Sequence, residues 1–542
     1  MAVISASAAL AQVPPPSAGS ILQQAVPPPV PMTAPGQVLT LPEPSQQANN
    51  STIQIPVSHV VITGNHLIPD DVLHALVQSA EGQQITLGGL RDCVNRITDA
   101  YHKKGYPVAY AYLPAQKIQD GLIKVQVVEP TYDEIVVTGA SRLRPSVVRT
   151  TVGVQSGDVI ESDTLQRGLL LLNQTPGVQI KGTLIPGAHP DTSTLQIETQ
   201  DRPLISAAIS DNNYGNKYTG PYLTNLNLSL ADPFGFGSSL SVNGLMSNTG
   251  GLKSDGFTLI SPNIWDGLRA GVYGSQSFYK LGGSFSTLGQ VGRYAQIGGD
   301  LNFPLILQPS QILNLRFDVL HDWLAQKTES TSANTAQAIM IERLSLQGAF
   351  FDSWNGTTTA NLTISQGNNS PSGDAASTAL AGTAGSFQVL QLGLGRTQGL
   401  PYDLQLTANL SGQLSSKNLD SSQQFFIGGP YGVMSYEAGD GGGDEGYLLR
   451  AELSHELPIP DLPGQLIGSL QLQNGTIWLH HSLYQGVTGP EHVTLTGIGS
   501  GISYHWGYFS ISGSYLRRIG ANGAPGYSTN KNQLWFQLGL SR

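Results

Sequence analysis

The sequence predicts an α+β N-terminal region followed by an all-β, sixteen-stranded antiparallel transmembrane barrel. Three observations predict this fold class. Two similar units precede residue 204, and their matching glycines, Gly64 in HVVITGN and Gly139 in EIVVTGA, lie 75 residues apart. From Leu204 onward, apolar residues alternate with polar or small ones, which is the period of a β-strand. Long and short links then alternate through the C-terminal region, as in a barrel with loops at one rim and turns at the other.

The composition argues against an ordinary cytosolic enzyme. Only 12% of the residues are charged, about half the share of an average soluble protein, and 64 are glycine. No run of about 18 consecutive apolar residues exists, so no transmembrane helix is predicted. The net charge of −10 disfavours nucleic acid as a partner. Because Cys93 is the one cysteine, no disulfide can form within the chain, and we expect Cys93 to be an inert core residue.

The first 55 residues predict export rather than a folded domain. Residues 1–11, ending in Ala-Leu-Ala, resemble the end of a signal peptide without its positive n-region, and a disordered Ala-rich tail is the alternative. Residues 12–55 are rich in Pro and Gln and predict an extended linker. A weak helix signal covers Ile21–Ala25 within this linker.

Residues 56–130 and 131–203 each predict a β-α-α-β-β unit. In the first unit, Thr86 is a candidate N-cap for a helix that ends before Gly105. The apolar residues of this helix fall at i, i+4, i+7 and i+11, which predicts one buried stripe: Leu90, Val94, Ile97 and Tyr101. The second unit has a matching helix in SDTLQRGLLLLNQ.

Sixteen strands are predicted in residues 204–542. They cover roughly 204–212, 221–231, 236–246, 254–262, 268–278, 290–303, 311–324, 340–351, 355–367, 383–397, 401–414, 445–457, 464–475, 491–504, 507–518 and 531–541. Short turns such as ADPFG and DSWNG follow the even-numbered strands, and longer loops follow the odd-numbered ones. A β-sandwich gives no reason for this sorting, whereas a barrel does. The order places residues 415–444 on the outer side, after the eleventh strand.

The stretch FFIGGPYGVMSYEAGDGGGDEGYLLRAEL, residues 425–453, carries the strongest resemblance to a known family. Gly428-Gly429-Pro430-Tyr431 followed by GYLLRAEL resembles the conserved long loop of the hemolysin secretion/activation family, the outer-membrane transporters of two-partner secretion. LTGIGSG at 495–501 resembles that family's late barrel strand. The resemblance implies that the two N-terminal units are periplasmic POTRA domains and that residues 415–444 fold back into the lumen. It also implies a hinge at Gly428, Gly429 and Pro430.

The loop tip departs from the family pattern. The family has Val-Arg-Gly-Tyr/Phe, whereas this chain has Val433, Met434, Ser435 and Tyr436, the residues we expect to gate the pore. The family's Arg pairs with the Asp of an Asp-x-Gly motif, and here that position reads Gln473-Asn474-Gly475. Losing both partners of a buried ion pair can be almost neutral, whereas losing one costs roughly 3–5 kcal/mol. Leu466, Leu470 and Leu472 alternate on one face of the strand, which predicts that Gln473 faces the lumen. We therefore predict that Gln473 meets the tip, which Met434 packing and amide contacts hold.

The resemblance implies a translocation pore in the outer membrane of a Gram-negative bacterium. Its client would be a large secreted exoprotein with an N-terminal secretion domain, and outer-membrane lipid and the barrel-assembly machinery would be further partners of a monomeric chain. An extended client can add to a POTRA sheet edge as a strand. The predicted contact residues lie on the second helices of the two units: Val94, Ile97, Tyr101, Leu165 and Leu169.

No enzymatic motif, cofactor site or metal site is predicted. GLGRTQG lies in a strand and turn rather than at a strand-helix junction, and His480-His481 has no further ligand at a characteristic spacing. Three alternatives to secretion remain. A barrel-assembly factor would carry more POTRA units, a passive porin would leave residues 56–203 without a role, and an enzyme with a barrel anchor would need an unassigned segment. Whether the client is a cytolysin, an adhesin, a heme-acquisition protein or a toxin stays open.

Overall fold

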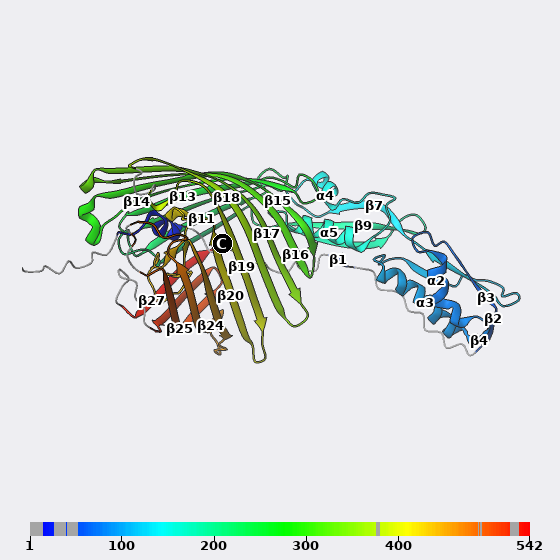
Figure 1. Ribbon diagram of the computed structural model, residues 1–542. Coiled ribbons are helices and arrows are strands. Elements are labelled where there is room, and N and C mark those ends of the chain that lie inside the picture. Colours follow the sequence, from blue (N-terminus) through cyan, green and yellow to red (C-terminus); the bar gives the residue numbers. More distant parts are fainter. Residues whose placement is uncertain are drawn as a thin grey trace, which may run out of the picture.

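The computed structural model describes residues 15–25, 39–40, 53–374, 380–485, 487, 490–520 and 530–542. Two small α/β units lie in a row beside one rim of a large barrel, with the first unit farthest from it (Figure 1). The predicted signal-peptide remnant, residues 1–11, lies outside the described residues. Among the described residues, no helix is both long enough and apolar enough to span a bilayer.

The first unit packs two helices against a three-stranded sheet of order β3-β6-β5. Its elements are β2 (Gln54–Val57), β3 (His59–Thr63), α2 (Asp70–Val77), β4 (Gln83–Thr86), α3 (Leu87–Lys103), β5 (Tyr110–Tyr112) and β6 (Leu122–Val128). Thr86 caps α3 as predicted, because its hydroxyl accepts the Gly89 N–H (3.1 Å). The predicted stripe of α3 is buried. The separate pair β2-β4 was not predicted.

The second unit has a four-stranded sheet of order β1-β8-β9-β7. Its elements are β7 (Thr131–Thr138), α4 (Pro145–Val152), α5 (Ser162–Asn173), β8 (Val178–Pro186) and β9 (Thr192–Asp201). The edge strand β1 (Leu39–Thr40) comes from the predicted linker and pairs in parallel with β8, Leu39 opposite Gly182. Part of the predicted extended linker therefore adds as a strand to the edge of this sheet, a pairing that was not predicted.

The remaining strands close into one antiparallel barrel of sixteen, as predicted. They are β10 (Ile205–Asn212), β11 (Leu223–Ala231), β12 (Ser239–Ser247), β13 (Leu252–Ile260), β14 (Arg269–Lys280), β15 (Gln290–Gln308), β16 (Gln311–Thr328), β17 (Ala333–Asp352), β18 (Gly356–Gly373), β19 (Gly385–Gly399), β20 (Leu404–Ser415), β23 (Glu445–Glu456), β24 (Gln465–Trp478), β25 (His492–Trp506), β26 (Phe509–Arg518) and β27 (Asn532–Ser541). The barrel closes where β10 pairs with β27 over five residue pairs, from Ala208 opposite Ser541 to Asn212 opposite Gln537.

The outer wall of the barrel is apolar and ends in aromatic side chains at the rim that bears the second unit. On β27, Leu534, Phe536, Leu538 and Leu540 are exposed, whereas Trp535 between them is 2% exposed and points inward. Exposed aromatic residues mark the short turns: Phe234, Trp265, Trp354, Tyr402, Trp506 and Tyr508. Such a band with an aromatic border is typical of a barrel that spans a lipid bilayer.

Strands β15 to β18 are longer than predicted. The expected strand at 340–351 begins at Ala333, and the one at 355–367 continues to Gly373. The extensions are polar, with the sequences ANTAQA and NNSPSG. Apolar and polar residues alternate only in the part of a strand that lipid covers. The hydrogen bonds between strands continue beyond that part, so the prediction made these strands too short.

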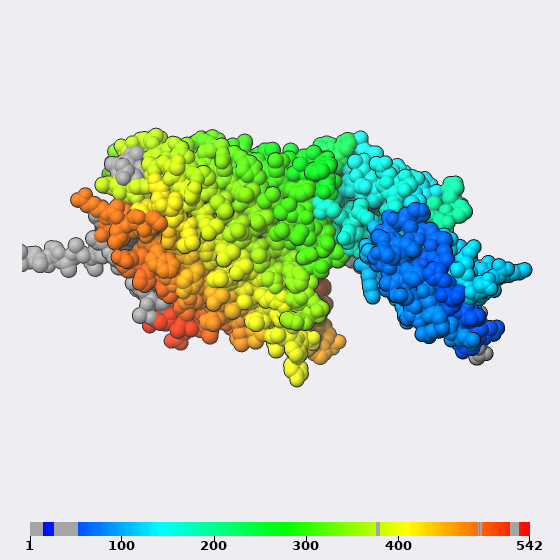
Figure 2. All heavy atoms as spheres, turned by 45° about the vertical axis from the view of Figure 1, so that its right-hand side comes forward, coloured from blue at the N-terminus to red at the C-terminus, as the bar shows by residue number. Residues whose placement is uncertain are grey.

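The second unit is fixed to the barrel by apolar and ionic contacts. Leu307 and Ile312, from the hairpin between β15 and β16, belong to the hydrophobic core that includes α5. Arg167 on α5 donates to Asp266 in the turn between β13 and β14 (2.9 Å) and to the Pro304 carbonyl (2.9 Å). Figure 2 shows this unit against the barrel rim and the first unit projecting away from it.

Candidate functional site

A short N-terminal helix lies inside the barrel. Helix α1 (Ala18–Leu22) and the 3₁₀ turn η1 (Gln23–Ala25) belong to the segment predicted as linker, at the place of the weak helix signal. Ile21 is fully buried in a cluster of residues from strands β11, β13 and β14 and the link after β14. The Gly19 N–H donates to the Ser421 hydroxyl (3.3 Å), and a Cβ at Gly19 would lie 1.8 Å from the Ser421 carbonyl oxygen. The helix therefore packs directly on the segment after β20.

That segment, residues 415–444, is called the lumen loop here. It contains the 3₁₀ turn η5 (Ser421–Gln423) and a small hairpin of β21 (Phe425–Phe426) with β22 (Gly442–Gly443). The Gly428 N–H donates to the Asp440 carbonyl (2.9 Å), which continues the hairpin toward the tip. Gly429 has φ +100°, and a Cβ there would lie 2.8 Å from Ala438 Cα. The predicted hinge at Gly428, Gly429 and Pro430 is thus a close-packed part of the loop, and its hinge role stays a prediction.

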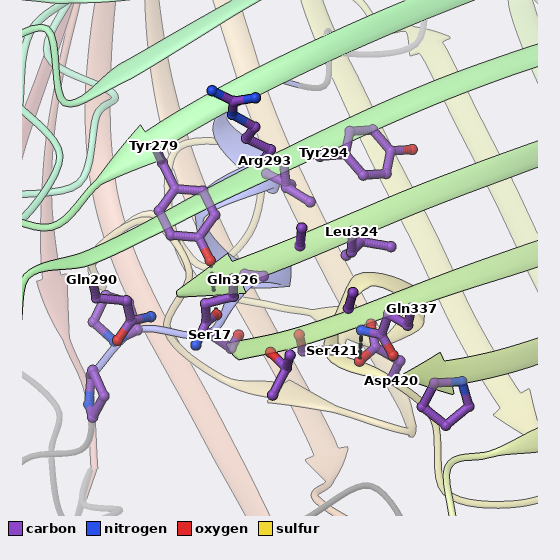
Figure 3. A pocket seen from close by; sticks show the side chains of 18 of the residues that line it. Ser17, Tyr279, Gln290, Arg293, Tyr294, Leu324, Gln326, Gln337, Asp420 and Ser421 are labelled. Atoms are coloured by element: carbon purple, nitrogen blue, oxygen red, sulfur yellow. Dashed lines mark hydrogen bonds between the residues drawn. The ribbon is translucent and has the colours of Figure 1, made fainter. Parts of the chain in front are cut away.

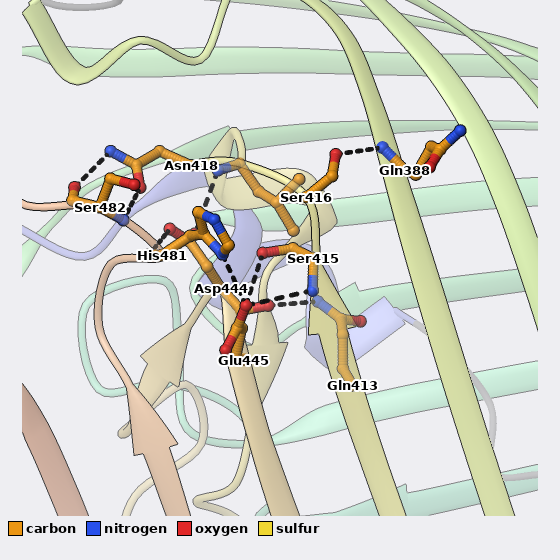
Figure 4. A network of polar contacts seen from close by, with 10 residues as sticks. Gln388, Gln413, Ser415, Ser416, Asn418, Asp444, Glu445, His481 and Ser482 are labelled. Atoms are coloured by element: carbon orange, nitrogen blue, oxygen red, sulfur yellow. Dashed lines mark hydrogen bonds and ion pairs between the residues drawn. The ribbon is translucent and has the colours of Figure 1, made fainter.

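A network of polar contacts holds the base of the lumen loop (Figure 4). The buried Asp444 carboxylate accepts the N–H groups of Leu419 (3.2 Å) and His481 (3.0 Å) and the Gln424 side-chain amide (2.9 Å). Gln413 on β20 donates to the Asp444 carbonyl (3.2 Å). The three donors to the Asp444 carboxylate therefore replace water around a charge that would be costly to bury alone.

Two strands hold the tip of the loop at Met434. The Met434 N–H donates to Gln473 Oε1 on β24 (2.9 Å), and Trp535 Nε1–H on β27 donates to the Met434 carbonyl (2.6 Å). The Met434 side chain packs on Leu516 and Trp535. Gln473 therefore faces the lumen and meets the tip in this structure, through the backbone amide rather than the Met434 side chain.

A third strand holds the next two residues. Arg518 on β26 donates from Nε to the Ser435 carbonyl (2.9 Å), and its guanidinium carbon lies 4.0 Å from the centre of the Tyr436 ring. On β25, Gly497 leaves space for the tip, since a Cβ there would lie 2.4 Å from Ser435 Oγ. Val433 and Tyr436 are fully buried. The gating role of the four tip residues stays a prediction, but all four are enclosed by the barrel wall.

Restoring the family's ion pair tests the tip contacts. Arg450 Nη2 lies 3.9 Å from Met434 Sδ, so Met434→Arg would bring a second guanidinium beside it. We expect the single variant to weaken loop binding and to raise single-channel conductance, and Gln473→Asp to offset part of this by supplying a negative charge.

The measurement is a double-mutant cycle on conductance in planar bilayers. If Met434→Arg and Gln473→Asp combined give the sum of their separate effects, positions 434 and 473 do not interact. Asn361→Asp, on β18, serves as the control that adds a charge to a lumen amide away from the tip, since the neighbouring Leu362 is exposed on the outside and Asn361 therefore faces inward.

A cavity of about 300 Å³ lies between helix α1, the lumen loop and the wall (Figure 3). Gln337 on β17 donates to Asp420 of the loop (2.6 Å), and the Tyr279 hydroxyl donates to Gln326 (2.9 Å). Ser17 and Ser421 also line this cavity. The helix and the loop together fill part of the lumen, and both polar and apolar contacts hold them there.

A family model described as haemolysin secretion/activation protein ShlB/FhaC/HecB matches residues 191–503, more than half of the chain. The chain belongs to this family. A model of the ShlB-type POTRA domain matches residues 55–130, which is the first unit. Membership makes the chain an outer-membrane transporter of two-partner secretion that exports a secreted partner, with its POTRA units in the periplasm.

Relatives and solved structures agree with this assignment. The heme/hemopexin transporter protein HuxB of Haemophilus influenzae (strain 86-028NP) is 28% identical over 508 residues, which cover 90% of this chain and 87% of HuxB. CdiB from Escherichia coli has a TM-score of 0.72 at 19% identity, covering 92% of this chain and 93% of CdiB. BamA from Haemophilus ducreyi, lacking POTRA domains 1–3, has a TM-score of 0.52 at 14% identity, covering 90% of this chain and 100% of that one. These two structures share the fold.

The residues predicted to contact the client of this transporter are buried, and their client-binding role stays a prediction. The five residues lie in the two POTRA cores, each at most 4% exposed: Val94, Ile97, Tyr101, Leu165 and Leu169. Contact with a client through these five side chains would require the unit to open. An apolar stripe indicates which face of a helix is buried but not what buries it. Here the sheet of the same unit covers that face.

Tyr101 shows how such a core residue is satisfied. Its hydroxyl donates to Glu129 (2.6 Å), which also accepts the N–H groups of His66 and Leu67. Burial, together with the hydrogen bond to the carboxylate, raises the pKa of Tyr101. Burial would raise the pKa of Glu129, but the bonds from Tyr101 and the two N–H groups outweigh it and lower that pKa.

Four residues of the transporter's site were missed from the sequence: Asp444, Gly497, Arg518 and Trp535. Gly497 lies within the quoted LTGIGSG motif, but nothing local shows that a loop packs on it. Arg518 and Trp535 interrupt the small and polar residues that face the lumen on the last strands, and that interruption is the signal that could have found them.

Proposed function

We propose that this transporter recognises a large secreted protein in the periplasm and exports it through the barrel after helix α1 and the lumen loop leave the lumen. The observation that carries the proposal is the lumen itself, which two separate segments of the chain occupy through specific contacts, beside a rim that bears the POTRA units. The work is binding and gating by a monomeric chain in outer-membrane lipid, and no catalytic step is required. Folding of the client outside the cell would draw the population toward the exported state.

The sheet edge at β5 supports a contact site for the client. Strand β5 is an edge strand, since its sheet has the order β3-β6-β5, and Tyr110 and Tyr112 on it are exposed. The Ala111 N–H points away from β6 and donates to the Thr98 hydroxyl of α3 (3.0 Å). An extended client segment entering between β5 and α3 would replace Thr98 as the partner of this N–H. The edge of β8 already carries the chain's own strand β1, so that edge is closed to a client.

Ala111→Pro removes the Ala111 N–H, the donor that client binding at β5 requires. We expect export of the client protein to fall, and its affinity for the purified transporter to fall about five- to tenfold, the value of one hydrogen bond. Thr98→Val, which keeps the side-chain shape and frees the N–H, should raise affinity. Secretion into the medium, binding to the detergent-purified chain and single-channel conductance are measured together.

The outcomes separate the competing functions. A passive porin predicts normal conductance and no effect of either variant on secretion. If the chain were an assembly factor, a function suggested by the fold likeness to BamA, the variants would reduce the amount of outer-membrane proteins in general rather than of one exported protein. Equal binding by Ala111→Pro and Thr98→Val would contradict the β5 site. An unchanged circular dichroism spectrum of Ala111→Pro is the control for folding, since proline is tolerated on edge strands.

A further inference from the structure

Two histidines and a glutamate meet on the first POTRA unit although the sequence separates them. His59 begins β3, His74 lies in the last turn of α2, and Glu81 follows the 3₁₀ turn η2 (Gln78–Ala80). His59 Nδ1 lies 2.7 Å and His74 Nε2 lies 3.1 Å from Glu81 Oε1. One possible ligand atom of each residue lies within 4.8 Å of those of the other two.

We propose that His59, His74 and Glu81 bind a divalent transition-metal ion, of which Zn²⁺ is the principal candidate. Two imidazoles and a carboxylate suit Zn²⁺, Ni²⁺ or Cu²⁺ rather than Mg²⁺ or Ca²⁺, which prefer oxygen ligands. Bonds of about 2.0–2.2 Å in a tetrahedral site place neighbouring ligand atoms roughly 3.3 Å apart. The observed separations from Glu81 Oε1 need to change by only tenths of an ångström. Three protein ligands leave a fourth position for water.

The carboxylate is oriented before any ion arrives. The Val60 N–H donates to Glu81 Oε1 (2.8 Å), and the turn is fixed by the Gly82 N–H, which donates to the Val57 carbonyl (2.8 Å). Such outer contacts commonly orient metal ligands. The His59 side chain is 55% exposed, which gives an ion access from solvent.

The alternative is a triad held by hydrogen bonds alone. In that arrangement the single oxygen Glu81 Oε1 accepts from the Val60 N–H, from His59 and from His74, which crowds its lone pairs. An ion between the three side chains would replace the two bonds to imidazole. It would also link β3, α2 and the turn before β4, so we expect slower amide exchange in these three segments when the ion is bound.

The test uses the full chain in detergent after removal of metal with a chelator. Zn²⁺ binding is followed by calorimetry, and Co²⁺ binding by its visible absorption, which reports the ligand geometry. We expect one site, with affinity about tenfold or more weaker in His59→Ala and in His74→Ala. His66→Ala is the matched control, because His66 pairs with Glu129 (3.4 Å) in the same unit without a second imidazole in the pair.

Either of two results would overturn the proposal. One is wild-type protein that binds no Zn²⁺ under these conditions, and the other is unchanged affinity in His59→Ala relative to His66→Ala. His74 is partly buried, so metal-free His74→Ala is first compared with wild type by circular dichroism. If that variant has lost structure, the exposed His59 carries the test, with His59→Gln as its second variant.

Discussion

Replacing Gly497 by leucine is expected to drive the loop tip out of the lumen and to raise channel conductance severalfold. A Cβ at position 497 would lie 2.4 Å from Ser435 Oγ, 3.0 Å from Ser435 Cβ and 3.4 Å from Val433 Cγ1. A leucine adds three more carbons to the same place. Because the tip is enclosed by the wall, it has no space into which to move while its hydrogen bonds persist, and overpacking of this kind costs roughly 1–3 kcal/mol or more.

The matched control is Gly393→Leu. Gly393 lies on β19 and faces the lumen, since its neighbours Leu392 and Leu394 are exposed on the outside, and its Cβ would meet only Asn361 Cβ at 3.6 Å. Single-channel recordings on both variants make the comparison. Equal conductance of Gly497→Leu and Gly393→Leu would show that the tip does not pack on β25 in the membrane.

Replacing Arg518 by alanine is expected to release the tip by a different route. The Ser435 carbonyl would lose its hydrogen bond inside the protein, which costs about 1–3 kcal/mol, and the Tyr436 ring would lose a cation contact of about 1–2 kcal/mol. A loss of about 3 kcal/mol raises the population of the released loop about a hundredfold.

Thiol labelling measures that population. The assay uses a chain with Cys93→Ala and Met434→Cys, so that its one thiol lies at the loop tip. A membrane-impermeant maleimide should react with this thiol up to about a hundredfold faster when Arg518 is replaced by alanine. The labelling rate of a buried thiol follows the fraction of molecules in which the loop is released. Arg517→Ala is the control, since Arg517 is the exposed neighbour on the opposite face of β26. A labelling rate that Arg518→Ala leaves at the Arg517→Ala value would contradict the assigned contact.

The barrel and the direction of Gln473 could be predicted because lipid and water impose a two-residue period on a spanning strand. Leu470 and Leu472 are exposed on the outside, so Gln471 and Gln473 have to face inward. The same period does not predict which segments of the chain lie in the lumen. A helix of five residues such as α1 is too short to show a period, and prolines on both sides of it predict extended chain.

The contacts that hold the loop tip could not be predicted because their partners are far apart in the sequence. Arg518 and Ser435 are separated by 83 residues, and Trp535 and Met434 by 101. The POTRA helices show a related limit. Their stripes were assigned both to core and to client, and only the packed unit shows that Tyr101 and Leu165 belong to the core.

The seam between β10 and β27 has a consequence for how the chain folds. It joins the first and last strands of the barrel. The Phe536 N–H donates to Asn213 Oδ1, and 323 residues of sequence separate the two. Its five residue pairs are fewer than those of the other neighbouring barrel strands, so little enthalpy is gained against a large loop-closure entropy. We therefore expect closure to be the slow, final event of biogenesis, preceded by an open sheet whose two terminal strands are unpaired and prone to aggregation.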